Sequence, residues 1–475
     1  MKFSSVLCSI VFLSVTSFSQ SKPALSTTVA AGPTDPTQQP DNPVPLGAIS
    51  QSSNSKEKIP RIQLEVTRFQ LANGLTVILH EDHSVPLISY HTWYRVGSKD
   101  EVAGATGAAH MLEHMMFKGS KKYSGQMYDK TLHENGISNN AFTTTDYTGF
   151  YENLPKGKLE LMMDMEMDRM RFLSLDPKAL ESELKVVSEE RRWRVDNNPR
   201  GMLHEALDDL AFPKSPYHWP VIGYMKDIEQ YTVDKLRPFY DAYYVPNNAV
   251  LVMVGDFESA KMKSLIEKNY GSLQSKSLPV KDYPKDPEQK QPRFRKIQGQ
   301  VQARAFVAAF PGVPTGHSDS YALDLIANIL GYGSSSRLYK DLVYQREEAT
   351  GVSVYNSTDK LAGLFQVHVS VKPGKNFDFA LNRVRAEVVR LRSQGVSEQE
   401  LEKAKNQVLV DFVDGLTTSD GKARSLALNE IQRGSWDSLL KDMDLYNAVT
   451  VAQIKEVATK YLQLSKENVV VLEPK

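Results

Sequence analysis

The pattern of hydrophobic and polar positions after about residue 60 predicts strands and helices in mixed order. Short apolar or alternating runs predict strands at 69–71, 75–79, 88–96, 139–145 and 250–254. The Asn73–Gly74 pair between the first two runs is typical of a tight hairpin turn. Longer stretches with helical spacing predict helices at about 103–118, 125–134, 157–172 and 178–196. This mixture, with hairpins, predicts an α+β fold.

Two segments 218 residues apart repeat one pattern. Thr232 precedes a helical pattern that reaches Tyr243 and then a β-branched strand, and Thr450 precedes the same succession through Tyr461. Each threonine is expected to be the N-cap of its helix. We therefore predict an internal duplication, with two homologous α/β-sandwich domains whose antiparallel or mixed sheets are covered by helices.

Composition shifts divide the chain into parts. The N-terminus has a positive end and a short apolar run followed by small residues, which is typical of a secretory signal peptide, with a buried helix or short anchor as the alternative. A polar stretch follows that cannot bury enough apolar surface to fold. The predicted order is a signal peptide at 1–19, a disordered leader at 20–58, a first domain at 59–273, a linker at 274–296 and a second domain at 297–475. The protein is expected to be secreted, in a bacterium to the periplasm, without stable membrane insertion.

Charge and cysteine content narrow the chemistry. Lys plus Arg and Asp plus Glu both number 57, so no basic excess indicates a nucleic-acid partner. The one cysteine is Cys8, inside the predicted signal peptide. A mature chain without cysteine excludes disulfides, cysteine-ligated zinc and a cysteine nucleophile. Any metal would be held by His, Asp and Glu.

The strongest chemical signal is the inverted motif His110-Met111-Leu112-Glu113-His114. Histidines four residues apart on a helix share one face and can reach one zinc ion at about 2.0–2.1 Å. Glu113 projects to the same side and can take a proton from water. Such pairs also occur as surface decoration or as core residues. However, residues 103–116 are mostly small or apolar, and buried imidazoles and carboxylates are costly unless paired or metal-bound.

A catalytic zinc needs a third protein ligand and one open position. Glu183 and Glu190 are seven residues apart on the predicted helix 178–196 and share a face, so both are candidates. Glu181 and Glu189 point elsewhere, and the charged run 189–194 is otherwise expected to be a solvated helix face.

Four segments resemble the pitrilysin-like (M16) metallopeptidases, which include the mitochondrial processing peptidases and insulin-degrading enzyme. They are LANGL at 71–75, YRVGS at 94–98, GAAHMLEHMMFKG at 107–119 and NAFT at 140–143. By length the chain is similar to the smaller, two-domain bacterial members. The resemblance implies Zn²⁺ as cofactor, a clam-like chamber formed by the two domains, Glu190 as third ligand and Glu183 as the residue that supports a ligand imidazole.

The resemblance also implies where a peptide lies. Asn140, Ala141 and Phe142 match an open edge strand to which substrate adds as an extended strand, although Asn140 alone could be an ordinary turn residue. Arg346 matches the arginine of a substrate-binding Arg/Tyr pair of the second domain. Val354 occupies the tyrosine position, and the adjacent Tyr355 would point to the other face of its strand.

The second domain carries no metal motif, since no histidine lies between His317 and His368. With the tyrosine missing as well, we expect this chain to be the zinc-bearing half of a heterodimer with a homologous, zinc-free partner subunit. The predicted activity is zinc-dependent endopeptidase action on unfolded or short peptides, with Glu113 as catalytic base. The alternative is a non-catalytic zinc-binding assembly subunit of a peptidase complex.

Overall fold

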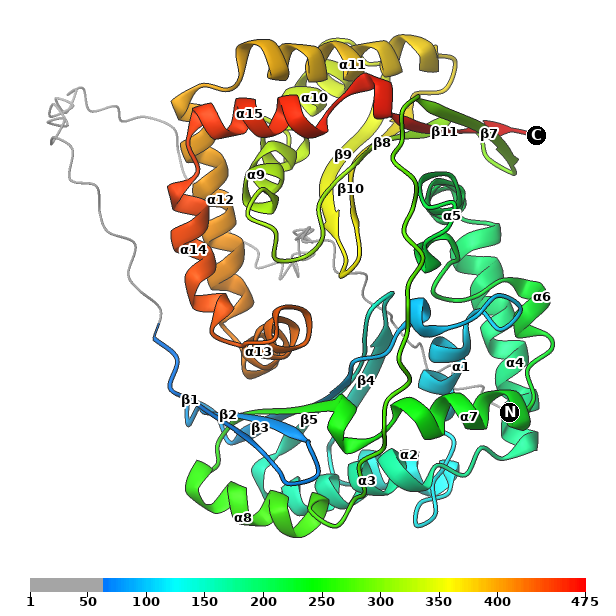
Figure 1. Cartoon of the computed structure of the whole chain (residues 1–475), viewed down its shortest axis with the longest axis vertical. Helices are drawn as coiled ribbons and strands as arrows, with labels where there is room; N and C mark the ends of the chain where they lie inside the picture. The colour runs from blue at the N-terminus through cyan, green and yellow to red at the C-terminus, as the bar shows by residue number, and fades with distance from the viewer. Residues whose placement is uncertain (1–62) are drawn as a thin grey trace, which may run out of the picture. The chain divides into compact units, whose positions relative to one another are not determined.

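A computed structural model describes residues 63–475, so the predicted signal peptide, the leader and Cys8 lie outside the described residues. The described residues from Leu64 onward belong to one compact unit. Two mixed sheets are covered by helices (Figure 1), which confirms the predicted α+β class. No helix among these residues is long and apolar enough to cross a bilayer.

The first sheet has six strands in the order β1-β2-β6-β3-β5-β4. Its strands are β1 (Val66–Gln70), β2 (Thr76–Glu81), β3 (Leu87–Tyr94), β4 (Ser138–Thr143), β5 (Thr148–Pro155) and β6 (Ala249–Gly255). β1 and β2 form the hairpin that Asn73 and Gly74 predict, and β2 pairs with β6 in parallel. β4 pairs with β5 and ends the sheet, so its other edge is not paired within this sheet.

The second sheet repeats this topology without an equivalent of β1. Its five strands follow the order β7-β11-β8-β10-β9. They are β7 (Arg293–Gly299), β8 (Ala305–Pro311), β9 (Ala349–Thr358), β10 (Gly363–Val371) and β11 (Asn468–Pro474). β11 is parallel to β7 and antiparallel to β8, just as β6 is parallel to β2 and antiparallel to β3. This shared order supports the predicted duplication.

The predicted helices are present, with some shifts at their ends. The helices of the first half are α1 (Ala108–Met115), α2 (Gly125–Glu134), α3 (Leu159–Phe172), α4 (Pro177–Arg191), α5 (Pro199–Ala211), α6 (Met225–Ile228), α7 (Val233–Tyr243) and α8 (Ser259–Tyr270). Those of the second half are α9 (Ser320–Gly331), α10 (Arg337–Tyr339), α11 (Phe377–Gln394), α12 (Glu398–Gly415), α13 (Ser419–Arg433), α14 (Ser438–Ala448) and α15 (Val451–Tyr461). α4 continues as a five-residue π-helix, η3 (Arg192–Asp196).

The repeated segments fold into equivalent helices. α7 and α15 both have 11 residues and both precede a seven-residue strand. Thr450 caps α15 because its side chain accepts a hydrogen bond from the Gln453 amide. Thr232 is likewise the N-cap residue of α7, as expected, but its side chain makes no capping hydrogen bond. The domain bounds at 59–273 and 297–475, with the linker between them, stay a prediction.

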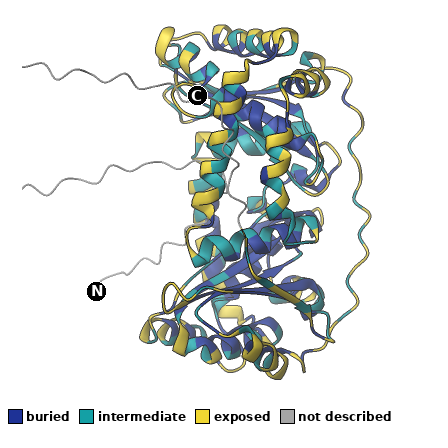
Figure 2. Ribbon diagram, turned by 90° about the vertical axis from the view of Figure 1, so that its left-hand side faces the viewer, coloured by how far each residue is buried: buried dark blue, intermediate teal, exposed yellow. Residues whose placement is uncertain are grey.

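Each half contributes one helix to the other half's sheet. α5, from the first half, packs Leu203 and Leu207 against Val307 and Leu472 of the second sheet. α13, from the second half, contacts β3 and β6 of the first sheet. Burial follows the strands and the helix faces turned toward them (Figure 2).

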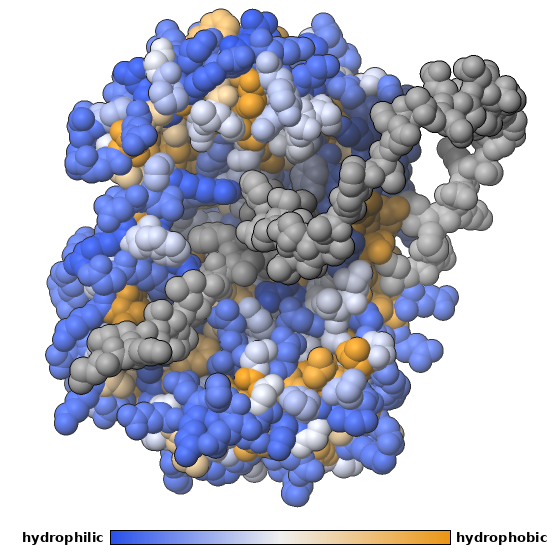
Figure 3. Space-filling view, turned by 180° about the vertical axis from the view of Figure 1, so that it is seen from behind, coloured by the Kyte–Doolittle hydropathy of each residue, from blue (hydrophilic) through white to orange (hydrophobic). Residues whose placement is uncertain are grey.

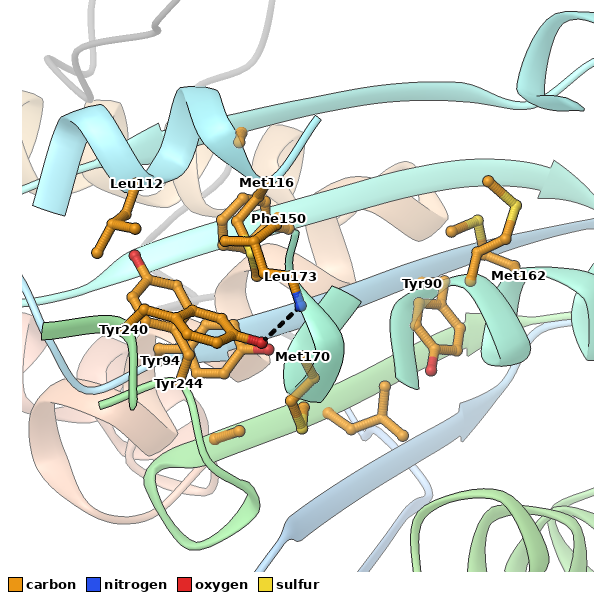
Figure 4. Packing of buried hydrophobic residues seen from close by; sticks show 14 of the residues in the cluster. Tyr90, Tyr94, Leu112, Met116, Phe150, Met162, Met170, Leu173, Tyr240 and Tyr244 are labelled. Atoms are coloured by element: carbon orange, nitrogen blue, oxygen red, sulfur yellow. Dashed lines mark hydrogen bonds between the residues drawn. The ribbon is translucent and has the colours of Figure 1, made fainter. Parts of the chain in front are cut away.

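Aromatic and methionine side chains fill the first core. Tyr94, Phe150 and Tyr244 pack beneath α1, and the hydroxyl of Tyr240 accepts a hydrogen bond from the Leu173 amide at 3.1 Å (Figure 4). The methionines of α3 belong to this core, as flexible gap-filling side chains usually do: Met162, Met163, Met165 and Met170 are buried and Met167 is partly buried. On the face seen in Figure 3, hydrophilic residues surround small groups of hydrophobic ones.

Candidate metal centre and active site

The helix α1 is wholly buried and has two chemically different faces. Leu112 and Met116 are directed into the tyrosine-rich core (Figure 4), while His110, Glu113 and His114 lie on the other face. The helix is shorter than the predicted 103–118 because it begins only after Gly107. This glycine has φ 88°, and a Cβ there would lie 2.5 Å from the Ile222 carbonyl oxygen.

A buried carboxylate holds the start of α1. Glu101 accepts hydrogen bonds from the amides of Gly107 at 2.7 Å and Ala109 at 2.9 Å. Gly107 has no side chain that could cap the helix, so Glu101 takes this role from six residues upstream. Sequence reasoning missed Glu101, because its distance in sequence from α1 matches no local capping pattern.

The two histidines of the motif converge with Glu190 of α4. One nitrogen or oxygen from each of His110, His114 and Glu190 lies within 4.8 Å of the others. Glu190 Oε2 is 3.2 Å from His114 Nε2 and 3.8 Å from His110 Nε2. Glu190 lies near the end of α4. The start of this helix is stabilised by Pro177 in its first turn and by the side chain of Asp176, which accepts a hydrogen bond from the Ala179 amide at 2.9 Å.

The two imidazoles differ in protonation in the metal-free protein because their charged neighbours differ. Desolvation, and after it the neighbouring His114, lower the pKa of His110 to about 3, so His110 is neutral and can offer a lone pair. Desolvation acts in the same direction on His114, but the hydrogen bond with Glu183 and the nearby Glu190 carboxylate outweigh it and raise the pKa of His114 to about 9. A metal that binds His114 therefore displaces a proton.

Glu113 is close enough to this group for the charges of His114 and Glu190 to act on it, and its two oxygens differ in their partners. Thr143 of β4 donates a hydrogen bond of 2.6 Å to Glu113 Oε2, whereas the buried Oε1 has no hydrogen-bond partner among the described residues. Burial raises the pKa of Glu113 to about 7, against the lowering effect of His114 and Thr143. The sequence analysis did not single out Thr143. The sequence indicated only that Thr143 lies in a strand and points to the opposite face from Phe142.

Two cations hold the outer oxygens of the two glutamates. Glu183 Oε2 lies 3.2 Å from His114 Nδ1, and Lys118 Nζ lies 2.7 Å from Glu183 Oε1. Arg194 Nε lies 2.8 Å from Glu190 Oε1. Glu183 thus orients an imidazole, in the manner that the resemblance implied.

The charged run 189–194 is not the uniformly solvated face that we expected. Glu189 and Arg192 are exposed and pair with each other. Arg191 and Arg194 instead fold inward, with 7% and 17% of their side chains exposed. Arg191 donates to the Gly223 carbonyl at 2.8 Å, so it fixes α4 to a neighbouring loop. Arg194 lies four residues after Glu190 and Arg191 lies eight residues after Glu183, so both arginines continue the buried face of the helix that carries the two glutamates.

The predicted peptide-binding strand lies next to α1. β4 carries Asn140, Ala141 and Phe142, and it contacts α1 directly. Ala141 faces the core, while Phe142 faces α13, whose Arg424 lies over the Phe142 ring at 5.3 Å. Asn140 Oδ1 accepts the Ala141 amide at 2.8 Å.

Among the described residues, no hydrogen bond or ion pair joins Arg346 or Tyr355 of the second half to His110 or His114. Arg346 is partly exposed and pairs with Asp341 at 2.8 Å. Val354 packs toward α9, where Gly331 leaves room for it. Tyr355 points to the opposite face, as expected, and its hydroxyl lies 3.0 Å from His204 Nε2 and 2.6 Å from His368 Nε2.

The donor set fits zinc. Both ring nitrogens of His110, Nε2 of His114 and Oε1 of Glu113 are buried without a hydrogen-bond partner among the described residues. Buried polar atoms are rarely left unsatisfied. Two imidazoles and one carboxylate are a common ligand set for catalytic zinc.

Comparisons with known proteins agree with this geometry. Residues 76–223 match the family model "Insulinase (Peptidase family M16)", and residues 230–408 match "Peptidase M16 inactive domain". The zinc protease PqqE of Helicobacter pylori is 32% identical over 418 residues, which cover 85% of this chain and 92% of that protein.

Solved structures give the same picture. A crystal structure of a protease from Helicobacter pylori matches with a TM-score of 0.83 and 29% identity, over 87% of this chain and all of that one. The periplasmic protease PqqL from Escherichia coli shares the fold, with a TM-score of 0.71 and 20% identity over 87% of this chain and 48% of that one. With its His-His-Glu group and these relatives, the chain belongs to peptidase family M16 and is a zinc protease of that family.

Proposed function

We propose that this chain is a zinc endopeptidase that cleaves internal bonds of unfolded or short peptides. His110, His114 and Glu190 hold the metal, and Glu113 is the general base. The observation that carries the proposal is the state of Glu113. Its Oε2 accepts a hydrogen bond from Thr143, its Oε1 is buried without a hydrogen-bond partner among the described residues, and the charges of His114 and Glu190 act on the carboxyl group.

The side chains divide the work of hydrolysis. When bound, zinc polarises the scissile carbonyl and lowers the pKa of water to about 7. Glu113 accepts the proton of the attacking water and then delivers it to the leaving amine. Glu183 keeps the ring of His114 in place through Nδ1, so that Nε2 faces the metal position.

The edge strand β4 supports recognition of extended peptides. β4 ends its sheet, and a peptide that pairs with it would be bound mainly through backbone hydrogen bonds. Asn140, Ala141 and Phe142 would position that peptide, and Thr143 of the same strand holds Glu113. A folded protein cannot offer a free strand, which favours unfolded or short substrates. The predicted chamber would add to this preference.

A partner subunit belongs to the proposal. Val354, at the position of the missing tyrosine, packs into the second core and offers no hydroxyl to a substrate. The side chain of Arg346 forms an ion pair with Asp341. A homologous zinc-free subunit would supply the complete Arg/Tyr pair. A role as a non-catalytic zinc-binding subunit is the alternative, and the held and buried Glu113 argues against it, because a structural metal needs no base. Export to the periplasm rests on the N-terminal segment.

Replacing Glu113 with Gln tests the catalytic role. E113Q should bind one zinc per chain, as the wild type does, but cleave a fluorogenic unfolded peptide about 10²–10⁴-fold more slowly. E189Q, a change at an exposed position on α4, is the matched control and should keep full activity. Removing zinc with a chelator should abolish wild-type cleavage, and added zinc should restore it.

Four results would overturn parts of the proposal. Full activity of E113Q, or a wild-type protein without zinc, would exclude the catalytic mechanism. Full activity of the purified chain alone would exclude the need for a partner. Wild-type protein that binds zinc but cleaves nothing, even with a partner, would favour the assembly-subunit alternative.

A further inference from the structure

We propose that Arg194 is a positioning residue that keeps Glu190 bound to the metal through one oxygen only. The inference rests on the proposed function, because it concerns the ligand set of that site. It assigns a role to a residue on the π-helix η3, four positions after Glu190.

The two oxygens of Glu190 face different partners. Oε2 faces the two histidines, at 3.2 Å from His114 Nε2 and 3.8 Å from His110 Nε2. Oε1 forms an ion pair with Arg194 Nε at 2.8 Å, without the geometry of a hydrogen bond, and the two side chains are only 11% and 17% exposed. A buried guanidinium at this distance competes with a metal ion for Oε1. One oxygen of the Glu190 carboxylate therefore remains for the metal and the other stays with Arg194, so that binding of the metal by both oxygens is disfavoured.

The same arrangement occurs at the neighbouring carboxylate. Glu183 turns Oε2 to His114 Nδ1 and Oε1 to Lys118 Nζ, at 3.2 and 2.7 Å. Both glutamates on this face of α4 thus have one oxygen directed to the metal centre and one held by a cation. This repetition argues that the Arg194 pair is part of the site and not an incidental surface pair.

The backbone around Arg194 is held closely. Gly201 of α5 lies so near that a Cβ there would be 2.1 Å from the Arg194 carbonyl oxygen and 2.8 Å from Val195 Cα. Any larger residue at position 201 would displace the segment that carries the guanidinium. Arg194 lies in a π-helix, a geometry often found at functional sites, and its side chain is largely buried while the adjacent Trp193 is 71% exposed.

The position of Arg194 has a chemical consequence. A catalytic zinc must keep one coordination position open for water and substrate. If both oxygens of Glu190 bound the metal, they would occupy this position or weaken the binding of water. The charge of Arg194 also acts on His110 and Glu113, so it offsets the negative charge that two carboxylates place at one centre.

The test compares Arg194 with Arg192. R194M and R194Q remove the cation, R194K keeps it, and R192M removes an exposed arginine that pairs with Glu189 on the same stretch of helix. Zinc affinity is measured by competition with a chromogenic chelator. The visible spectrum of cobalt-substituted protein reports the ligand number, because four-coordinate cobalt(II) absorbs more strongly than five-coordinate cobalt(II). Circular dichroism and the unfolding midpoint of the metal-free proteins identify variants that do not fold.

We expect R194M and R194Q to bind zinc about 10–100-fold more weakly and to show a weaker cobalt spectrum. R194K should stay close to the wild type in its spectrum, and R192M in both measurements. Either neutral variant suffices if the other does not fold. Wild-type affinity and spectrum in a folded R194M or R194Q would overturn the inference, as would an equal loss in R194K. A wild-type protein that binds no zinc would instead overturn the proposed function, so the two failures are distinguishable.

Discussion

The hydrogen bond from Thr143 to Glu113 makes a quantitative prediction. It measures 2.6 Å, within the range of charge-assisted O–H···O⁻ bonds, and Glu113 is fully buried. A hydrogen bond to a charged group contributes about 1.5–3 kcal/mol. Because one pKa unit corresponds to about 1.36 kcal/mol, T143V should raise the pKa of Glu113 by about 1–2 units. The bond favours the ionised base, so its loss moves the pKa upward.

The assay is the pH dependence of kcat/KM, whose acid limb reports the base in the free enzyme. We expect the limb of T143V to move to higher pH, so that activity at neutral pH falls about tenfold and recovers in more alkaline buffer. T145V is the matched control, because Thr145 donates a comparable bond of 2.8 Å to Asp359, away from the metal group. An unchanged acid limb in T143V, or an equal shift in T145V, would refute the reasoning.

Two further predictions concern stability. E101A leaves two amides at the start of α1 without their acceptor, so chemical unfolding of the metal-free protein should show a loss of about 1–3 kcal/mol. E101Q should lose less, and equal stability of wild type and E101A would contradict the capping role. Burial, and after it the Asp146 carboxylate, raise the pKa of Asp359 in the folded protein. The neutral carboxyl group is therefore favoured in the folded state, and its contribution to the free energy of unfolding is present at acid pH and lost as pH rises through the folded-state pKa. D359N should therefore unfold at higher urea than the wild type at pH 8 but not at pH 4, and a constant difference between the two pH values would count against this assignment.

Local pattern was sufficient for much of the fold. The strand alternation and helical spacing predicted β3, β6 and α2, whose observed range, Gly125–Glu134, equals the prediction. Helix geometry alone places the i,i+4 histidines on one face and Glu183 and Glu190 on another, whereas their convergence on His114 was implied by the resemblance to the family.

The remaining features depend on contacts between distant segments. The late start of α1 results from Glu101 and from the close approach of Ile222 to Gly107, neither of which has a local sequence signal. The change from α-helix to π-helix at Arg192 also has no local signal, since periodicity predicted one continuous helix at 178–196. Arg194 was still within reach of sequence reasoning, since a glutamate and an arginine four residues apart commonly pair on a helix.

The helices α5 and α13 also bear on how the protein is made. The first sheet is complete once β6 has been synthesised, but the α13 residues that pack on β3 and β6 follow roughly 170 residues later, or about 9–34 s at the usual 5–20 residues per second. During this interval an apolar sheet face of the nascent chain has no cover, and such surfaces promote aggregation. We expect a fragment truncated before α13 to need a chaperone to stay in solution, which would also make it unsuitable as an isolated catalytic domain.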